Sequence, residues 1–493
     1  MSKKPELFGT DGVRGTVGKF PLVPEFVVKL GTATGAVMSK GQAAPTVLIG
    51  RDTRQSGQML QSALTAGLLA SGATVIDLGV MPTPGVAFLV NKLGAQAGVV
   101  ISASHNPVEQ NGIKIINADG SKLPESTEVE IERMAGNTEL HATAPVHGYG
   151  RCLDGAGFRE LYVAGLLAEH PELDLSAVTV VIDCANGAAS SYAPECFARL
   201  GAKTITINAS PTGVNINRFA GSEQVRKYPR DLFTLMQQHS AQFGIAFDGD
   251  ADRAVFVDDR GELVDGDHIL AILATYLQDH GKLLGNTIVA TNMRNQGLVE
   301  FVQQRKINYI ETKVGDKYVT EKLVALAKDD PQGAFIGLGG EQAGHIILYD
   351  PTHNTGDGIR TALWMIKAFV ALKAESLSAL AACVRKAPQV IASAHVTGKP
   401  ALESIDELEQ IKKSLTKELP DMQRMELRYS GTEPVFRAML EGGFNNTEQE
   451  LADMAWKMCR AVQKAAGVTA RHPDSIEILN VSRGGLMIPH IEE

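Results

Sequence analysis

The chain alternates between short apolar runs and longer amphipathic stretches. Residues 47–50, 179–183 and 287–291 are β-branched runs, and each ends in a polar loop that leads into a helical pattern. After the first run, the spacing of apolar residues predicts a helix from about 56 to 70. Strands that alternate with helices favour βαβ units with largely parallel pairing. Because the three units start about a domain's length apart, they predict three similar α/β domains, with a single large α/β sheet as the alternative.

Breaks in composition divide the chain further. A stretch rich in Gly, Thr and His covers residues 136–157, and residues 258–261 are typical of a turn between a strand and a helix. Beyond residue 386 the pattern changes to a charged helical region at 404–417 and then a strand at 425–428. This change predicts a fourth, smaller α+β domain. The expected domains are residues 1–165, 166–262, 263–383 and 384–493.

Composition, charge and cysteine usage narrow the class of protein. Of the 493 residues, 44% are hydrophobic, and the formal net charge is -9. This is ordinary globular usage, and the absence of a basic stripe from the sequence argues against a nucleic-acid partner. Apolar runs such as 269–274 are too short to span a bilayer, and the N-terminus has no apolar segment of the signal-peptide kind. The sequence therefore predicts a protein without a membrane or nucleic-acid partner.

Five cysteines indicate the compartment. None of them stands in a CxxC pair, which is typical of reduced thiols rather than of a disulfide or zinc framework. A cytoplasmic protein is therefore expected. The cysteines are Cys152, Cys184, Cys196, Cys383 and Cys459.

A loop with three aspartates is the strongest local signal. Asp248, Asp250 and Asp252 alternate along one glycine-containing loop, directly before an apolar strand. They offer hard oxygen ligands suited to Mg²⁺ or Ca²⁺, and without a cation the three carboxylates would repel one another. An EF-hand is excluded, because Arg253 and Asp259 occupy its Gly and Glu positions. A dehalogenase-type Asp nucleophile and a solvated acidic turn remain as alternatives.

A second loop places serine beside histidine. Ser104 and His105 follow the apolar strand at 99–101, which suggests a nucleophile with its base. Taken alone, loop serines next to a proline are more often turn formers. Lys114 lies within ten residues of Ser104 and is a candidate proton donor or phosphate partner.

Two further loops carry groups that bind anions and hydroxyls. Arginines, hydroxyls and a glycine near residue 430 form a candidate phosphate cradle, with a surface turn as the alternative. Glu341 and Gln342, flanked by glycines, are suited to bonding vicinal hydroxyls, with a helix N-cap loop as the alternative. The members of the phosphate cradle are Arg428, Ser430, Gly431, Thr432 and Arg437.

Together these loops resemble the α-D-phosphohexomutase superfamily, and within it the bacterial phosphoglucosamine mutases. The resemblance extends from residue 8 to about 442 and rests on five motifs in the family's order. They are residues 8–15 (FGTDGVRG), 102–107 (SASHNP), 248–253 (DGDADR), 341–345 (EQAGH) and 428–434 (RYSGTEP).

Single positions distinguish the chain within that family. Gln342 is associated with the glucosamine branch, whereas Ala343 stands where serine is usual and Tyr429 where proline is usual. Residues 220–223 are Ala-Gly-Ser-Glu, where a cysteine and then a threonine are typical, and the tail from about 468 is longer. These departures bear on substrate preference and not on the reaction type.

The resemblance implies a fold and a catalytic centre. It implies four domains around a central cleft and an active enzyme that is phosphorylated on Ser104. Ser104 and the three aspartates would hold one Mg²⁺ per subunit. Arg14 and Arg253 would add positive charge nearby, and Lys114 with His105 would handle the proton of the attacking hydroxyl.

The resemblance also implies the substrate contacts and the reaction. Glu341 and Gln342 would bind ring hydroxyls, and the phosphate cradle would hold the phosphate remote from Ser104. The implied reaction converts glucosamine 6-phosphate to glucosamine 1-phosphate through a sugar bisphosphate, with glucosamine 1,6-bisphosphate or a similar compound as primer. It would supply amino-sugar and cell-wall precursors.

Three other functions stay open at this point. A phosphoglucomutase or phosphomannomutase would share the machinery, a dehalogenase-type phosphatase would use Asp248 as nucleophile, and a sugar-phosphate sensor would carry no phosphate. A homodimer and phosphorylation of Ser104 by a kinase are also left open.

Overall fold

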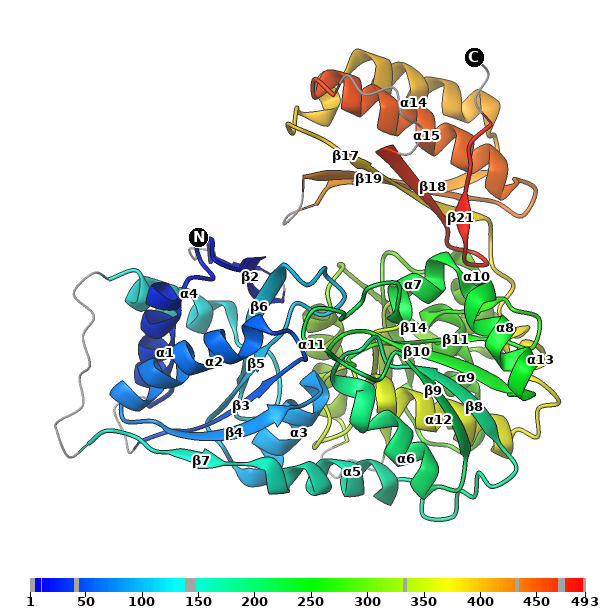
Figure 1. The fold of residues 1–493 in the computed structure, drawn as a ribbon. Coiled ribbons are helices and arrows are strands. Elements are labelled where there is room, and N and C mark those ends of the chain that lie inside the picture. The colour runs from blue at the N-terminus through cyan, green and yellow to red at the C-terminus, as the bar shows by residue number, and fades with distance from the viewer. Residues whose placement is uncertain are drawn as a thin grey trace.

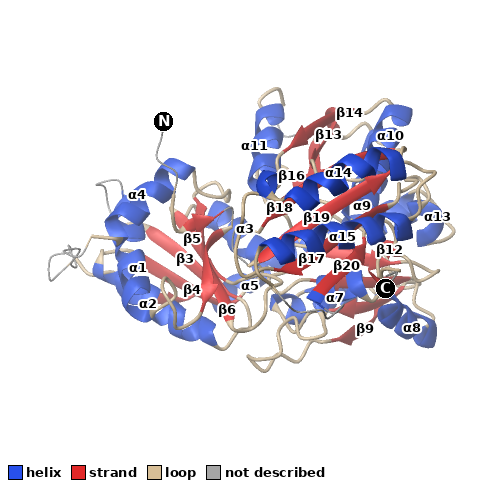
Figure 2. Ribbon diagram, turned by 90° about the horizontal axis from the view of Figure 1, so that it is seen from above, coloured by secondary structure: helices blue, strands red, loops and turns tan. Residues whose placement is uncertain are grey.

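The computed structural model describes residues 5–9, 11–39, 44–137, 148–330, 335–430, 434–468 and 475–490. The described chain forms four units, each built on one sheet (Figure 1). Three of them make a broad lower body, and the fourth, yellow to red in Figure 1, lies above it. Seen from above in Figure 2, the fourth unit covers the second and third units rather than the first. No helix within these ranges is long and apolar enough to cross a membrane.

The first unit is a mixed sheet with helices on its faces. In spatial order its strands are β1 (Phe8–Gly9), β2 (Gly12–Thr16), β6 (Gln110–Asn117), β5 (Ala97–Ile101), β3 (Thr46–Arg51), β4 (Thr74–Val80) and β7 (Cys152–Asp154). Its helices are α1 (Pro24–Ser39), α2 (Ser56–Ala70), α3 (Thr83–Leu93) and α4 (Glu125–Ala135). Strands β5, β3, β4 and β7 pair in parallel, and β6 pairs antiparallel with β5. The predicted strand at 47–50 and helix from about 56 to 70 are confirmed as β3 and α2.

The second unit carries the aspartate loop at the turn between two central strands. In spatial order the strands are β12 (Leu263–Val264), β11 (Ala254–Val257), β10 (Phe243–Phe247), β8 (Thr179–Asp183) and β9 (Lys203–Ile207). The helices are α5 (Arg159–Ala168), α6 (Ala193–Arg199), α7 (Gly221–Lys227) and α8 (Pro229–His239). Every residue of β10 and β11 is buried, as expected for strands covered on both faces. The aspartate loop that joins these two strands is therefore held at both ends by buried strands of the sheet.

The third unit has the smallest sheet. In spatial order its strands are β14 (Asn308–Thr312), β13 (Leu283–Thr291), β15 (Ile336–Gly340) and β16 (Ile346–Tyr349). Its helices are α9 (Gly266–Asp279), α10 (Gln296–Arg305), α11 (Asp316–Ala327), α12 (Gly358–Ala371) and α13 (Leu377–Ala381). Like the second unit, it combines parallel central strands with one antiparallel neighbour.

The fourth unit is an antiparallel sheet with helices on one face. In spatial order the strands are β18 (Met422–Tyr429), β19 (Val435–Gly442), β17 (Gln389–His395), β20 (Ile476–Asn480) and β21 (Leu486–Met487). Helices α14 (Asp406–Glu418) and α15 (Glu448–Ala465) cover the upper face in Figure 1. A capping box formed by Thr447 and Glu450 starts α15. The uncovered face of the sheet points toward the lower body.

The hydrophobic cores show how the units are joined. One buried cluster runs through the second and third units and reaches α3 of the first. The fourth unit has a core of its own, and the amide side chain of Gln389 in β17 accepts hydrogen bonds from Asn295 and Gln342 of the third unit. Three α/β units and a smaller α+β unit are as predicted, and a single large sheet is wrong, since four separate sheets are present. The domain boundaries at 165, 262 and 383 stay predictions.

Candidate active site

The serine loop begins where β5 ends. All of β5 is buried, and Ser104 follows in the left-handed backbone region, with φ at 54°. The Ser104 side chain is buried, and its Oγ donates a hydrogen bond to Asp248 Oδ2 at 2.5 Å. The candidate nucleophile and the candidate metal loop therefore meet, although they belong to different units.

A buried arginine that sequence reasoning did not single out holds this loop. Arg54 lies just before α2 and is 1% exposed. Its Nε donates to Asp52 Oδ2 at 2.8 Å. Left-handed backbone costs an L-residue roughly 1–2 kcal/mol, and the bonds of Arg54 to the loop offset that cost. They reach the main-chain carbonyls of Ser104 (2.9 Å), Asn106 (2.7 Å), Pro107 (2.5 Å) and Gln110 (3.0 Å).

Further side chains complete the support of the serine. Ser102 Oγ donates a hydrogen bond to Asp52 at 2.6 Å. The same Ser102 oxygen accepts a hydrogen bond from the Ser104 N–H at 2.9 Å. From the second unit, Asn217 Nδ2 donates to the carbonyl oxygens of Ser104 at 2.8 Å and Asn106 at 3.0 Å. The position of Ser104 is thus fixed from two units at once.

The three aspartates form a compact cluster between β10 and β11. All are buried, and one oxygen of each lies within 4.8 Å of the others. Burial, together with the charges of Asp252 and Asp250, raises the pKa of Asp248 well above its ordinary value. Asp250 Oδ1 and Asp252 Oδ1 have no hydrogen-bond partner among the described residues. Buried acceptors need a partner, so this donor set fits a small divalent cation with oxygen ligands, such as Mg²⁺.

A cationic side chain lies against the cluster. Lys114 on β6 donates to Asp250 Oδ2 at 2.7 Å, and Thr83 Oγ1 donates to the same oxygen at 2.7 Å. Burial opposes the charge of Lys114, but Asp250 and Asp252 outweigh burial and raise the pKa of the ammonium group. Lys114 is therefore positively charged beside the serine and the aspartates.

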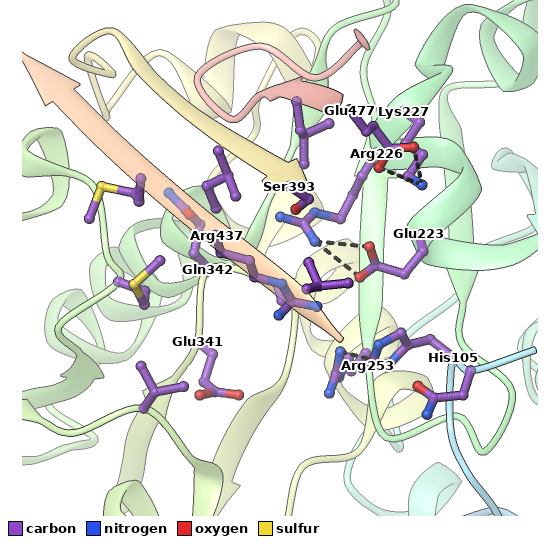
Figure 3. Close-up of a pocket in the computed structure, with 18 of the residues that line it drawn as sticks. His105, Glu223, Arg226, Lys227, Arg253, Glu341, Gln342, Ser393, Arg437 and Glu477 are labelled. Carbon is purple, nitrogen blue, oxygen red and sulfur yellow. Dashed lines mark hydrogen bonds and ion pairs between the residues drawn. The ribbon is translucent and has the colours of Figure 1, made fainter. Parts of the chain in front are cut away.

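The other predicted catalytic residues also converge here. His105 Nδ1 lies 3.5 Å from Ser104 Oγ and 3.3 Å from Arg253 Nη1, and Figure 3 shows His105 and Arg253 at the same end of the cleft. Burial and the nearby Arg253 charge lower the pKa of His105 to about 3, so its imidazole is neutral. Arg14 on β2 pairs with Asp11. Lys114 Nζ lies 3.2 Å from the same Asp11 carboxylate, and the catalytic roles of these residues stay predictions.

A chain of ion pairs joins the first unit to the third beside the aspartates. Lys122 Nζ lies 2.7 Å from Asp11 Oδ1 and 2.6 Å from Asp316 Oδ1. His345 Nε2 lies 3.4 Å from Asp316 Oδ2, and its Nδ1 lies 3.7 Å from Asp252 Oδ1. The sequence analysis placed His345 in the sugar loop. It did not predict that His345 also approaches Asp252 of the aspartate loop.

Side chains from all four units line one cleft of about 590 Å³ (Figure 3). Cationic and anionic side chains both line it, which lets it hold a ligand that carries both phosphate and hydroxyl groups. The lining includes His105 from the first unit, Glu223 and Arg226 from the second, Glu341 from the third and Arg437 from the fourth.

The predicted hydroxyl-binding loop lies in the wall of this cleft. Glu341 Oε1 accepts a hydrogen bond from the Gly315 N–H at 3.0 Å. Gln342 Nε2 donates to Asp267 Oδ2 at 3.0 Å and to Gln389 Oε1 at 2.8 Å. The amide nitrogen of Gln342 therefore joins the third unit to the fourth, a contact that sequence reasoning missed. The roles of both residues toward a sugar stay predictions.

The sheet of the fourth unit presents a polar row to the cleft. Arg428 and Arg437 are register partners on β18 and β19, and burial together with the Arg437 charge lowers the pKa of Arg428. Two adjacent guanidinium groups favour an anion between them, and their N–H forks match phosphate. The polar row, from β20 to β18, is Glu477, Ser393, Arg437 and Arg428.

The rest of the phosphate cradle continues from this row. Ser430 directly follows β18, and its N–H donates to the Val435 carbonyl at 2.8 Å. Gly431 and Thr432 lie outside the described residues. A buried serine thus lies beside a carboxylate cluster, and an arginine pair lies on a facing wall of the cleft. This arrangement suits transfer of a phosphate group at one place and retention of a phosphate group at another.

Magnesium is expected to stabilise the protein through the aspartate cluster. At a Mg²⁺ concentration of 100 times Kd, a cation that binds only the folded state adds roughly 2.7 kcal/mol of stability. The melting temperature of the wild type should therefore rise when Mg²⁺ replaces a chelator, and Asp250→Asn should lose most of that rise. Asp231→Asn, an exposed change on α8, is the matched control and should behave as the wild type. An equal rise in Asp250→Asn would contradict the assignment.

Family models match three consecutive parts of the chain. The models describe α/β/α domains I, II and III of phosphoglucomutase/phosphomannomutase, and they match residues 5–141, 160–261 and 265–387. Each match contains one sheet of the lower body. The match therefore follows the architecture unit by unit.

Solved structures share the fold over the whole length. A phosphoglucomutase/phosphomannomutase family protein from Burkholderia thailandensis has a TM-score of 0.71 at 22% identity, covering 94% of this chain and 98% of that one. An N-acetylphosphoglucosamine mutase from Aspergillus fumigatus, solved with GlcNAc-6P and magnesium, has a TM-score of 0.60 at 17% identity, covering 94% and 96%. The fold is thus shared with these proteins over nearly the whole chain.

Curated relatives are considerably more similar in sequence. A phosphoglucosamine mutase from Syntrophotalea carbinolica is 40% identical over 95% of this chain and 99% of its own length. Another from Shouchella clausii is 43% identical over 90% of this chain and 96% of its own length. Because these relatives match nearly the whole chain and the three family models match its lower body, the chain belongs to the phosphoglucosamine mutases of the phosphoglucomutase/phosphomannomutase family.

Proposed function

We propose that the protein interconverts glucosamine 6-phosphate and glucosamine 1-phosphate through phosphorylated Ser104. The observation that carries the proposal is the contact of Ser104 Oγ with Asp248, beside a cleft whose facing wall holds Arg428 and Arg437. A phosphatase needs only the first of these features. A mutase needs both, because one phosphate is transferred while the other is retained. The relatives named phosphoglucosamine mutase support the choice of an amino sugar.

The chain's own groups account for the transfer step. The phosphorus–oxygen bond of phospho-Ser104 breaks as a new one forms to a free sugar hydroxyl. That hydroxyl gives up its proton, and the released serine oxygen takes one up. Lys114, bound to Asp250, and Arg253 supply positive charge where the transferring group is negative. Lys114 together with His105, which lies 3.5 Å from the serine oxygen, is proposed to handle the proton that passes between the two oxygens. Mg²⁺, held by Ser104 and the three aspartates, would neutralise further phosphate charge when bound.

Retention and reorientation of the intermediate involve the other end of the cleft. The first transfer yields glucosamine 1,6-bisphosphate, which must turn over before its original phosphate returns to the serine. Arg428, Ser430 and Arg437 are proposed to hold the phosphate that is not reacting, and Glu341 with Gln342 to guide the ring hydroxyls. The fourth unit has its own core, which suits a domain that moves to release and recapture the intermediate. The same bisphosphate would serve as primer.

A substrate panel tests the proposal. With Mg²⁺ and a trace of sugar bisphosphate, kcat/KM for glucosamine 6-phosphate should exceed that for glucose 6-phosphate and mannose 6-phosphate by about tenfold or more, or about 1.4 kcal/mol of transition-state preference. A lead for glucose or mannose would keep the reaction and overturn the substrate. Hydrolysis without isomerisation would overturn the reaction itself.

Several finer assignments are proposed on the sequence alone. They are a cytoplasmic location, one Mg²⁺ per subunit, a homodimer, and priming of Ser104 by a kinase or by a sugar bisphosphate. Intact-mass measurement before and after incubation with glucosamine 1,6-bisphosphate separates the two priming routes. A gain of one phosphoryl group from the bisphosphate alone would make a kinase unnecessary.

A further inference from the structure

Helix α7 presents a charged pair, Glu223 and Arg226, to the cleft. Neither residue has a role in the proposed transfer of phosphate. Arg226 Nη1 lies 3.0 Å and 3.2 Å from the two carboxylate oxygens of Glu223 (Figure 3). Both residues line the cleft, yet Arg226 is only 8% exposed. Glu223 is also one of the positions at which the chain departs from the family pattern. The pair therefore stands in the wall of the cleft without an assigned role.

The guanidinium of Arg226 has donors to spare. Glu223 engages Nη1, and Nε has no hydrogen-bond partner among the described residues. Arginine carries five N–H donors in a fixed fork, and a buried cation loses hydration that must be replaced by bonds to protein or ligand. The Glu223 carboxylate, which contacts a single nitrogen of the guanidinium group, replaces only part of the lost hydration. Arg226 thus has room for a second anion.

The position of α7 shows where that anion would lie. The helix is anchored to the polar row of the fourth unit, because Lys227 Nζ lies 2.8 Å from a Glu477 carboxylate oxygen. In Figure 3 the Arg226 side chain extends from α7 toward Ser393, the neighbour of Arg437 in that row. Arg226 and the Arg428–Arg437 pair therefore face the same space from different units.

We propose that Arg226 is a third phosphate-binding arginine, which contacts from the second unit the phosphate that Arg428 and Arg437 hold from the fourth. This inference rests on the proposed function, since it takes that phosphate to belong to a sugar phosphate. A phosphate bound by both units draws the fourth unit onto the second and closes the cleft. Glu223 is the counter-ion that holds Arg226 in place before the substrate arrives.

Binding and kinetics of four variants test the inference. Calorimetry with glucosamine 6-phosphate should give a Kd for Arg226→Met about tenfold weaker than that of the wild type, or about 1.4 kcal/mol. The KM of Arg226→Met should rise in parallel, with a smaller change in kcat. The Kd of Arg226→Lys should lie between those of the wild type and Arg226→Met, because lysine keeps the positive charge but lacks the forked N–H donors of arginine. Glu223→Gln keeps the guanidinium group and an oxygen acceptor for it, so its Kd should lie closer to the wild-type value than the Kd of Arg226→Met does. Arg230→Met, an exposed change on α8 whose side chain bonds the Arg260 carbonyl, is the matched control.

Each other outcome overturns a defined claim. Wild-type affinity in Arg226→Met would overturn the inference. An equal loss in Glu223→Gln and Arg226→Met would show that the pair only holds α7 in place, and would overturn it too. If the wild type binds glucosamine 6-phosphate without isomerising it, the proposed function fails while the comparison of Kd values still decides on Arg226. If the wild type does not bind, both fall.

Discussion

Ser104→Ala is expected to remove mutase activity, with kcat lower by roughly 10⁴-fold or more. The serine oxygen is the atom proposed to carry the phosphoryl group, and alanine offers no replacement. The loop itself should keep its shape, because Arg54 and Asn217 bind main-chain carbonyls and not the serine side chain. A coupled assay for glucosamine 1-phosphate measures the loss, and a melting temperature close to the wild-type value verifies the fold.

Asp248→Asn serves as the companion variant. In the phosphoserine mechanism both variants lose activity, and only Asp248→Asn keeps the hydroxyl that accepts phosphate from a bisphosphate. A dehalogenase-type enzyme would use Asp248 as nucleophile and would keep its activity in Ser104→Ala. Full activity in Ser104→Ala, with none in Asp248→Asn, would therefore replace the serine mechanism by the aspartate one.

Arg54→Met is expected to destabilise the protein by about 3–5 kcal/mol. The side chains of Arg54 and Asp52 are both fully buried, so methionine leaves the Asp52 carboxylate without its counter-ion and the carbonyls of the serine loop without donors. At roughly 2–4 °C per kcal/mol for a domain of 150–250 residues, the melting temperature of the first unit should fall by about 10 °C. Activity should fall as well, since Ser104 loses the contact that holds its left-handed backbone.

A double-mutant cycle separates the two causes. Combining Arg54→Met with Asp52→Asn removes the buried charge, so the pair of changes should cost less than the sum of the single costs. Activity should not recover, because the carbonyls of the serine loop still lack their donors. Additive stability losses would mean that Asp52 and Arg54 act independently, contrary to the 2.8 Å contact between them.

Local patterns predicted the elements and the loops of the site. The three β-branched runs lie in β3, β8 and β13, and the helix predicted after the first run is α2. A buried parallel strand and an amphipathic helix both follow from the order of apolar residues. The aspartate loop was recognisable because three carboxylates on a short turn have few uses without a cation. The serine loop alone was ambiguous, and the order of the other motifs decided its interpretation.

The supports of the site could not be predicted in the same way. Arg54 lies two residues from Asp52, but the carbonyls that it binds are those of a loop from another part of the chain. Gln342 was assigned to sugar hydroxyls from its loop, and nothing nearby in sequence indicated that its amide nitrogen bonds Gln389 in the fourth unit. Lys122 joins two units through carboxylates that are distant in sequence. Such contacts arise only when the units pack, so local residue patterns do not contain them.

The central claim is that the phosphoryl group of Ser104 passes to the sugar and is replaced by the phosphate that the sugar brought. Protein labelled with radioactive phosphate on Ser104 and mixed with unlabelled glucosamine 6-phosphate and Mg²⁺ tests it in a single turnover. The account predicts that the label leaves the protein and appears in glucosamine bisphosphate and glucosamine monophosphates, while Ser104 is phosphorylated again without label. Release of the label as inorganic phosphate, or its retention on the protein during isomerisation, would contradict the account.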